Sequence, residues 1–355
     1  MRHTCCETWV KCGPTRENPR NEERVDGETG NGGAVMSRMS TRDRRPEAKA
    51  RPTGLPADED AARLVGAALA EQAAREMAEP LAGGLYIVAT PIGNLGDMTV
   101  RAATTLARAD SILCEDTRVS RTLLARYAIK RPLRAFHEHN EEAEQIRVLA
   151  ELAEGQAIAL ISDAGTPLLS DPGFKLVRAV VAAGHSVVAL PGASAVLAGL
   201  TMSGLPTDSF FFGGFLPARQ GARRTRLEQL ASVPASLVLF ESPNRIVEVL
   251  SDIAATLGAR EVVVARELTK HFEEVRRGSA DDLSREIANE GVKGEIVLVI
   301  APPPPSESSD DDIIEALRRE LVASSLRDAA RIVADELGAA RSRVYQLGLR
   351  LKDET

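Results

Sequence analysis

The chain has 355 residues, 44% of them hydrophobic, which is enough for two domains with largely aliphatic cores. Its net charge of -7 at pH 7 excludes a general electrostatic attraction to nucleic acid, so a nucleic-acid partner must meet a local basic patch. The four cysteines fit neither a disulfide framework nor a four-ligand zinc site, and no apolar run approaches the roughly 18 residues of a membrane helix. Since no signal peptide is apparent either, we expect a cytoplasmic protein.

Residues 1–82 are predicted to form an N-terminal extension. The stretch from Met1 to about Pro56 is polar and lacks periodicity, which is typical of disorder, and Met36 or Met39 is an alternative start. Ala57–Met77 has apolar residues at helical spacing, so we expect a helix that is either docked on the body or solvated.

Strand and helix patterns alternate over residues 83–205, which predicts an α/β domain with a mostly parallel sheet. The strands expected there are Leu85–Ala89, Ser111–Cys114, Ile158–Ile161 and Ser186–Leu190. A second α/β domain is expected over residues 206–301, beginning with the phenylalanine-rich run Phe210–Phe215 and ending with Glu295–Ile300. A proline-rich linker at 302–311 then precedes three short helices within 312–355, which are compatible with a helix-turn-helix unit.

Short loops of small residues follow four of the predicted strands. They are Thr90–Asn94, Asp163–Pro167, Pro191–Ala195 and Glu241–Pro243. Gly165 can adopt backbone angles that other residues avoid, and it lets a ligand approach the main chain. Because loops at the carboxyl edge of a sheet form ligand crevices in α/β proteins, these four loops predict a binding site.

Several polar residues allow both a functional and a structural interpretation. Glu115, Asp116 and Arg118 suit chemistry in a cleft, or a helix N-cap with its ion pair. The run His137–His139 is a poor match to zinc spacing, so no metal is expected, and Asn140 suits a helix cap. A basic segment predicts either contacts with RNA phosphates or a solvated helix face, and its members are Arg219, Arg223, Arg224 and Arg226.

Nine segments between Gly84 and Ile300 follow one another almost without a gap: GLYIVATPIGNLGDMTVRA, CEDTRVSRTLL, FHEHNE, ALISDAGTPLLSDPG, LPGASA, SGLPTDSFFFGGFLP, FESPNR, ARELTKHFEE and KGEIVLVI. In this order they resemble the tetrapyrrole methylase superfamily, and most closely its ribosomal RNA small subunit methyltransferase I family. The resemblance implies two α/β domains of the tetrapyrrole methylase type with S-adenosylmethionine in the cleft between them, and a homodimer. It also implies methylation of the ribose 2'-hydroxyl of a cytidine in 16S rRNA of the small ribosomal subunit.

One departure from the superfamily bears on the substrate. Ala164–Pro167 stands where the cobalamin-pathway members carry a Gly-Gly-Asp-Pro type of sequence, which favours the ribosomal branch over a tetrapyrrole substrate. By the same resemblance, twelve residues are expected to contact the cofactor: Pro91, Asp163, Gly165, Thr166, Ser194, Ala195, Phe240, Glu241, Ala265, Arg266, Gly294 and Glu295.

Methyl transfer from a sulfonium needs the attacking oxygen aligned opposite the sulfur, and a carboxylate or imidazole within reach could take the hydroxyl proton. The candidates for this base are Glu115, Asp116, His137 and Glu267, and the reaction could also proceed without one. Two other functions stay open at this point: a methyltransferase acting on a tetrapyrrole or other small molecule, and a noncatalytic ribosome-binding module that keeps the pocket as structure.

Overall fold

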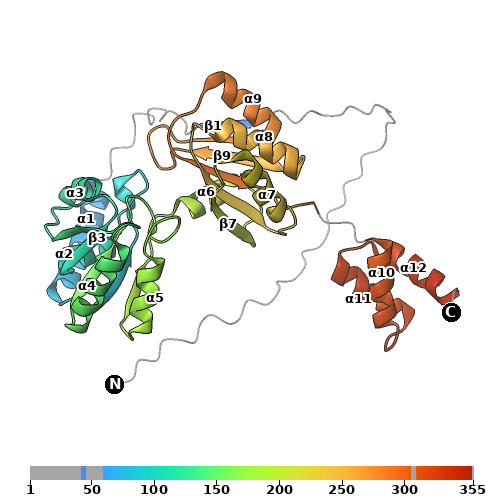
Figure 1. Ribbon diagram of the computed structural model, residues 1–355, viewed down its shortest axis with the longest axis horizontal. Helices are drawn as coiled ribbons and strands as arrows, with labels where there is room; N and C mark the ends of the chain where they lie inside the picture. The colour runs from blue at the N-terminus through green and yellow to red at the C-terminus, as the bar shows by residue number, and fades with distance from the viewer. Residues whose placement is uncertain (1–40, 45–58, 305–308, 354–355) are drawn as a thin grey trace. The chain divides into compact units, whose positions relative to one another are not determined.

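The computed structural model describes residues 41–44, 59–304 and 309–353 (Figure 1). The disorder predicted for residues 1–56 therefore falls outside the described residues, except at Thr41–Arg44. These four residues form strand β1, which pairs antiparallel with β10 (Glu274–Ser279), so the prediction was wrong there. Pairing with an edge strand uses main-chain hydrogen bonds and needs no apolar side chains, which explains why a polar segment could form it.

The first sheet is entirely parallel, with strand order β4-β3-β5-β2-β6. Its strands are β2 (Gly84–Val88), β3 (Ser111–Cys114), β4 (Leu133–Ala135), β5 (Ala157–Leu160) and β6 (Val187–Leu190). Both faces of β2 are buried, because Tyr86 and Val88 pack into one apolar cluster while Leu85 and Ile87 pack into another. The predicted parallel sheet is thus confirmed.

Among the described residues, four α-helices cover this sheet, two on each face. The short helix η1 (Leu95–Asp97) follows β2, then α2 (Val100–Arg108) and α3 (Thr117–Arg126) supply Leu106 and Leu124 to the first cluster. On the other face α4 (Glu141–Ala153) and α5 (Phe174–Ala182) supply Val148 and Val180. Because the strands are parallel and connected by these helices, the carboxyl ends of β2, β3 and β5 lie at the same edge of the sheet.

The second sheet is mixed, with strand order β1-β10-β9-β11-β8-β7. It contains β7 (Phe210–Phe215), β8 (Ser236–Glu241), β9 (Glu261–Arg266) and β11 (Ile296–Ile300), in addition to β1 and β10. Only the β7–β8 pair is parallel among the described strands of this sheet. One face packs against α7 (Gln220–Leu230), α8 (Ile246–Leu257) and α9 (Ala280–Glu290), through an aliphatic cluster that includes Leu298.

The opposite face of the second sheet is covered by α6 (Ala195–Ser203), which directly follows the last strand of the first sheet. Val196 and Leu200 of α6 pack with Val297 of β11. At Gly199 the helix comes so close that an added Cβ would lie 2.7 Å from the Cγ1 atom of Val297. Helix α6 therefore connects the first sheet to the second and packs on the second, and its N-terminus lies where the loops of both sheets meet.

The remaining helices lie at the two ends of the described chain. Helix α1 (Glu59–Ala78) buries none of its residues, but its Glu76 accepts a hydrogen bond from Thr104 and pairs with Arg108 at 3.9 Å, both on α2. At the other end, α10 (Asp310–Glu320), α11 (Leu326–Leu337) and α12 (Arg341–Asp353) surround a small core of their own. None of the helices in the described ranges has both the length and the apolar composition needed to cross a membrane.

Candidate active site

A cavity of about 370 Å³ opens where loops of the first sheet, the start of α6 and loops of the second sheet converge. Its wall consists of five stretches of chain and three single residues. They are Asp163–Thr166 with Leu169–Asp171, Ser194–Val196, Phe240–Pro243, and Gly294–Val297, together with Ile92, Phe215 and Leu268. The cavity therefore lies at the strand ends where the loop sequences placed a ligand site.

The loop after β5 is fixed by main-chain hydrogen bonds to the loop after β2. The backbone N–H of Thr90 donates to Gly165 O at 2.9 Å, and that of Gly165 donates back to Thr90 O at 3.0 Å. Gly165 has φ +79°, a left-handed conformation that favours glycine. The Thr166 hydroxyl also donates to Ala193 O at 3.0 Å, which ties this loop to the turn before α6.

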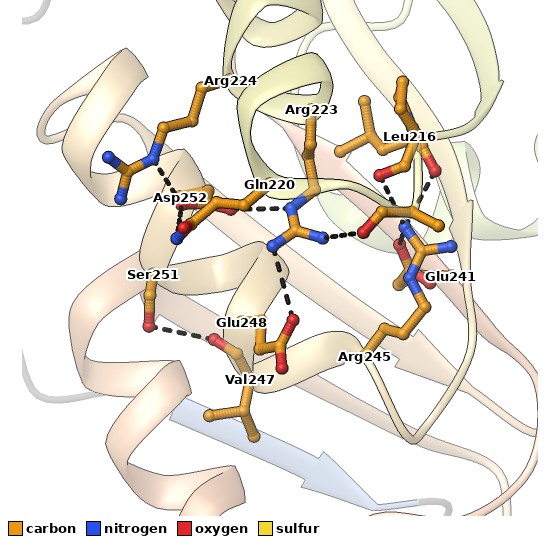
Figure 2. Close-up of polar contacts among 12 residues, drawn as sticks. Leu216, Gln220, Arg223, Arg224, Glu241, Arg245, Val247, Glu248, Ser251 and Asp252 are labelled. Carbon is orange, nitrogen blue, oxygen red and sulfur yellow. Dashed lines mark hydrogen bonds and ion pairs between the residues drawn. The ribbon is translucent and has the colours of Figure 1, made fainter.

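The wall formed by the second sheet depends on a buried ion pair. The Glu241 side chain is 1% exposed, and its Oε2 lies 3.3 Å from Nη2 of Arg245 (Figure 2). The same Nη2 donates to Leu216 O at 2.8 Å, so Arg245 links the end of β8 to the loop after β7. Phe215 and Phe240 pack edge to face with ring centroids 5.6 Å apart, which gives this wall an aromatic surface.

The third wall is the turn before β11. Gly294 has φ +87°, and an added Cβ there would overlap the side chain of Glu267. Glu267 Oε1 accepts from the backbone N–H of Glu295 at 3.1 Å and from Lys270 Nζ at 2.9 Å. Glycine is therefore required at position 294 for the chain to pass between the cavity and this carboxylate.

The cavity is acidic. Four carboxylates line it, those of Asp163, Asp171, Glu241 and Glu295, and none of its described lining residues is lysine, arginine or histidine. Two of these carboxylates also have cationic partners just outside the wall, since Glu241 pairs with Arg245 at 3.3 Å and Glu295 with Lys270 at 3.0 Å. Apolar side chains such as Ile92 and Leu268 complete the wall. Such a site suits a ligand with an apolar body and positive charge.

Nine of the twelve residues predicted to contact a cofactor line this cavity, namely Asp163, Gly165, Thr166, Ser194, Ala195, Phe240, Glu241, Gly294 and Glu295. The other three lie outside its wall. Pro91 is buried beside the lining residue Ile92, and Ala265 is fully buried in the second sheet. Arg266 instead pairs with Glu274 at 2.7 Å, so its guanidinium stabilises the β9–β10 pair.

The structure separates the four predicted bases. Asp116 caps α3, and hydrogen bonds from the side chain and backbone of Arg118 lower its pKa to about 2, so it is a weak base. Burial raises the pKa of Glu267, but hydrogen bonds from Lys270 and the Glu295 backbone outweigh it and lower the pKa below its usual value. Both carboxylates are thus already occupied by structural partners.

Glu115 and His137 lie closer to the candidate chemistry. Burial and the charge of Asp163 raise the pKa of Glu115, which lines a small cavity next to the large one. The Nδ1 atom of His137 is buried and has no hydrogen-bond partner among the described residues. Asn140 begins α4 as predicted, but its side chain binds the backbone of His137 and Ala135 and not the helix. No cluster of three or more metal-ligating side chains occurs in the described part of the chain.

The predicted RNA contacts need one correction. Arg223 is 1% exposed, and its Nε donates to Asp252 Oδ2 at 2.7 Å inside the α7–α8 interface (Figure 2). Its predicted contact with RNA was wrong, because the guanidinium neutralises a buried carboxylate. Arg224 reaches the same Asp252 at 2.7 Å but stays 48% exposed, and Arg219 is exposed at the start of α7. Arg226 lies over the Phe211 ring, with its guanidinium carbon 5.9 Å from the centroid.

Twelve further residues line the cavity that sequence reasoning had not named as cofactor contacts, among them Leu169, Ser170 and Asp171. Those three belong to the stretch that carried the family resemblance. Their position in the wall results from the path of the loop after Pro167, which sequence spacing does not reveal.

Comparison with known proteins agrees with this fold and site. Residues 84–284 match the family profile for Tetrapyrrole (Corrin/Porphyrin) Methylases, and residues 307–352 match that of the RsmI C-terminal HTH domain. The two sheets and the cavity are therefore those of a tetrapyrrole methylase. Ribosomal RNA small subunit methyltransferase I of Mesorhizobium japonicum is 49% identical over 281 residues, covering 78% of this chain and 95% of that protein.

Relatives of the same name from other bacteria are similarly close. The Xylella fastidiosa protein is 46% identical, covering 74% of this chain and 98% of that protein. The Haemophilus influenzae protein is also 46% identical, covering 76% and 97%. The chain belongs to the ribosomal RNA small subunit methyltransferase I family, which confirms the resemblance seen in the sequence. It is thus an S-adenosylmethionine-dependent methyltransferase, and the acidic, partly apolar cavity suits this cationic cofactor.

Proposed function

We propose that this protein methylates the ribose 2'-hydroxyl of a cytidine in 16S rRNA, acting on the small ribosomal subunit. The observation that carries the proposal is the cavity with four carboxylates and no basic residue among its described lining residues, in a chain of this family. Bound S-adenosylmethionine would supply a methyl group activated by positive charge. The protein's own contribution is to hold that charge and to align the acceptor oxygen.

Different residues of the cavity are suited to holding the charge and to binding the rest of the cofactor. The Asp163 carboxylate, which accepts from the Asp116 backbone N–H at 3.1 Å, provides negative charge in a set position, and Glu241, held by its ion pair with Arg245, offers a fixed acceptor. Phe215 and Phe240 offer an aromatic surface for a flat, apolar group. No metal is needed for this chemistry, since the electrophile already carries its charge.

The RNA would meet a small basic surface and not a long groove, in keeping with the net charge of -7. Arg219 and Arg224 project from the start of α7, whose preceding loop is tied to the cavity wall by Arg245. Such guanidinium groups are suited to phosphate contacts. Acting on a ribosomal subunit, the enzyme would work in the cytoplasm.

We also propose that two copies pair, as the superfamily resemblance implies. Phe174 and Val181 lie seven residues apart on α5 and are 68% and 61% exposed, so an apolar strip is available for an interface. The molecular mass measured by light scattering decides between a monomer and a dimer.

The test of the substrate is methyl transfer from labelled S-adenosylmethionine to small subunits purified from a strain that lacks the enzyme. We expect label in 2'-O-methylcytidine after nuclease digestion and nucleoside analysis. Subunits from a strain that has the enzyme are the matched control and should accept little label, because the site is already modified. Label in another nucleoside, or cofactor binding with no transfer, would contradict the proposal.

A further inference from the structure

Asp171 belongs to both cavities at the strand ends of the first sheet. It lines the large cavity of about 370 Å³ and also a second one of about 10 Å³, which has room for roughly one water molecule. Glu115 and Ser162 line the second cavity as well. Asp171 therefore borders both the cofactor cavity and a small recess that Glu115, just after β3, also lines.

The loop that carries Asp171 is held in a strained conformation. Leu168 and Ser170 have φ values of 75° and 71°, which are unfavourable for residues other than glycine. Such conformations persist only where the surrounding structure enforces them. Here Gly173 packs closely on Leu168, since an added Cβ would lie 2.7 Å from the Leu168 Cδ2 atom. The surrounding structure thus holds the loop next to Asp171 in an unfavourable backbone conformation.

The charged groups around Asp171 set its proton affinity. Burial and the negative charge of Glu115 raise the pKa of Asp171 to about 6, the charge of Asp163 adds to this, and a hydrogen bond from Ser162 opposes it. His137, after β4, acts on Glu115 in the opposite sense. A carboxylate with a pKa of about 6 is ionised at neutral pH yet accepts a proton more readily than Asp116 or Glu267 would.

We propose that Asp171 accepts the proton of the ribose 2'-hydroxyl during methyl transfer. This inference rests on the proposed function and adds a base that sequence analysis had not named. In the step, the ribose oxygen forms a bond to the methyl carbon while the carbon–sulfur bond of the donor breaks and its electron pair stays on sulfur. The hydroxyl proton passes to a carboxylate oxygen of Asp171 and from there to solvent.

The test compares single-turnover methylation of small subunits by the wild type, Asp171→Asn and Asp171→Glu between about pH 5 and 8. The wild-type rate should rise with pH as Asp171 ionises. Asp171→Asn should be slower by about 10²–10⁴-fold and lose this rise, with the cofactor kept at saturating concentration because Asp171 also lines its cavity. Asp171→Glu, which keeps a carboxylate, should recover part of the rate. Asp208→Asn, at an exposed aspartate before β7, is the matched control and should behave as the wild type.

The Glu115→Gln variant distinguishes an Asp171 that accepts the proton from an Asp171 with only a structural role. Removing the neighbouring negative charge lowers the pKa of Asp171, so the rise in rate should move to lower pH. Without any substrate, the infrared difference between wild type and Asp171→Asn should show one carboxyl titrating near pH 6.

An active Asp171→Asn enzyme that keeps its pH dependence would overturn the inference, as would the absence of that infrared signal. If the wild type itself formed no 2'-O-methylcytidine, the proposed function would fail and the inference with it.

Discussion

At the residue scale, the buried pair Arg223–Asp252 shows how one sequence pattern can have two unrelated uses. Four arginines within eight residues predicted a basic surface, yet the second of them is 1% exposed and bonded to a carboxylate that is equally buried. A buried guanidinium with several hydrogen bonds is a structural element, because removing either partner leaves a charge in a low dielectric. The sequence could not distinguish Arg223 from Arg224, since only the packing of α7 on α8 decides which of them faces inward.

We therefore expect Arg223→Ala to lower the free energy of unfolding by about 3–5 kcal/mol. Arg224→Ala removes a half-exposed partner of the same carboxylate and should cost no more than about 1 kcal/mol. Urea unfolding of the two variants measures both values. Equal effects would mean that Asp252 is not confined to a buried site.

The difference in free energy of unfolding between the wild type and Arg223→Ala should depend on pH. Burial alone raises the pKa of Asp252, but hydrogen bonds from Arg224, Arg223 and Gln220 outweigh it and lower the pKa below the usual value. The stabilisation is therefore fully present above the unfolded-state pKa of about 3.9, and it is lost as the pH falls through the lower folded-state pKa. The difference in free energy of unfolding between the wild type and Arg223→Ala should become smaller only in that acidic range.

At the scale of elements, helix α6 determines whether the cavity is complete. Its first residues line the cavity and its body packs on the second sheet, with closest approach at Gly199. Gly199→Leu would force α6 away from Val297 of β11. We expect a loss of about 1–3 kcal/mol in the free energy of unfolding from overpacking, together with weaker cofactor binding because Ser194–Val196 shift.

Gly66→Leu is the matched control for this prediction, because Gly66 lies in α1 with open space around its Cα. It should leave cofactor affinity unchanged and slightly raise helix stability. Calorimetric titration with S-adenosylmethionine and urea unfolding give both quantities. Unchanged cofactor affinity in a folded Gly199→Leu protein would show that α6 does not shape the site.

Elements with strong apolar patterns could be predicted from the sequence, and polar ones could not. Strands such as β5 and β11 are continuous aliphatic runs, which burial on both faces requires. Strand β10, in contrast, reads Glu-Val-Arg-Arg-Gly-Ser, and its Glu274 and Arg276 are buried by pairing with each other at 3.3 Å. That pairing depends on β9 and α9, so no local signal indicates the strand. Likewise the ligand loops were evident in the sequence, whereas no local signal indicates the left-handed conformations of Leu168 and Ser170 in the turn that carries Asp171.

For the whole molecule, the RNA contact that we propose on α7 would have to compensate for the net charge of -7. We expect the double variant Arg219→Gln with Arg224→Gln to bind small subunits more weakly and to show a shallower dependence of affinity on salt, because fewer counterions are released. Cofactor affinity should not change. The measurement is filter binding across a salt series.

The matched control removes the same charge elsewhere, at the exposed Arg126 of α3 and Arg178 of α5. If this control weakened subunit binding equally, net charge and not the α7 surface would be responsible. Arg223 is left intact in both variants, so that folding and binding are not confounded.

The acidic cavity also has a consequence for turnover. When the methyl group leaves, the sulfur of the donor becomes neutral, so the spent cofactor carries one positive charge fewer than the molecule that entered. The carboxylates of Asp163, Glu241 and Glu295, which we propose lie close to the bound donor, then no longer attract that sulfur. We therefore expect the same wall that draws the donor in to release the by-product faster, which limits product inhibition.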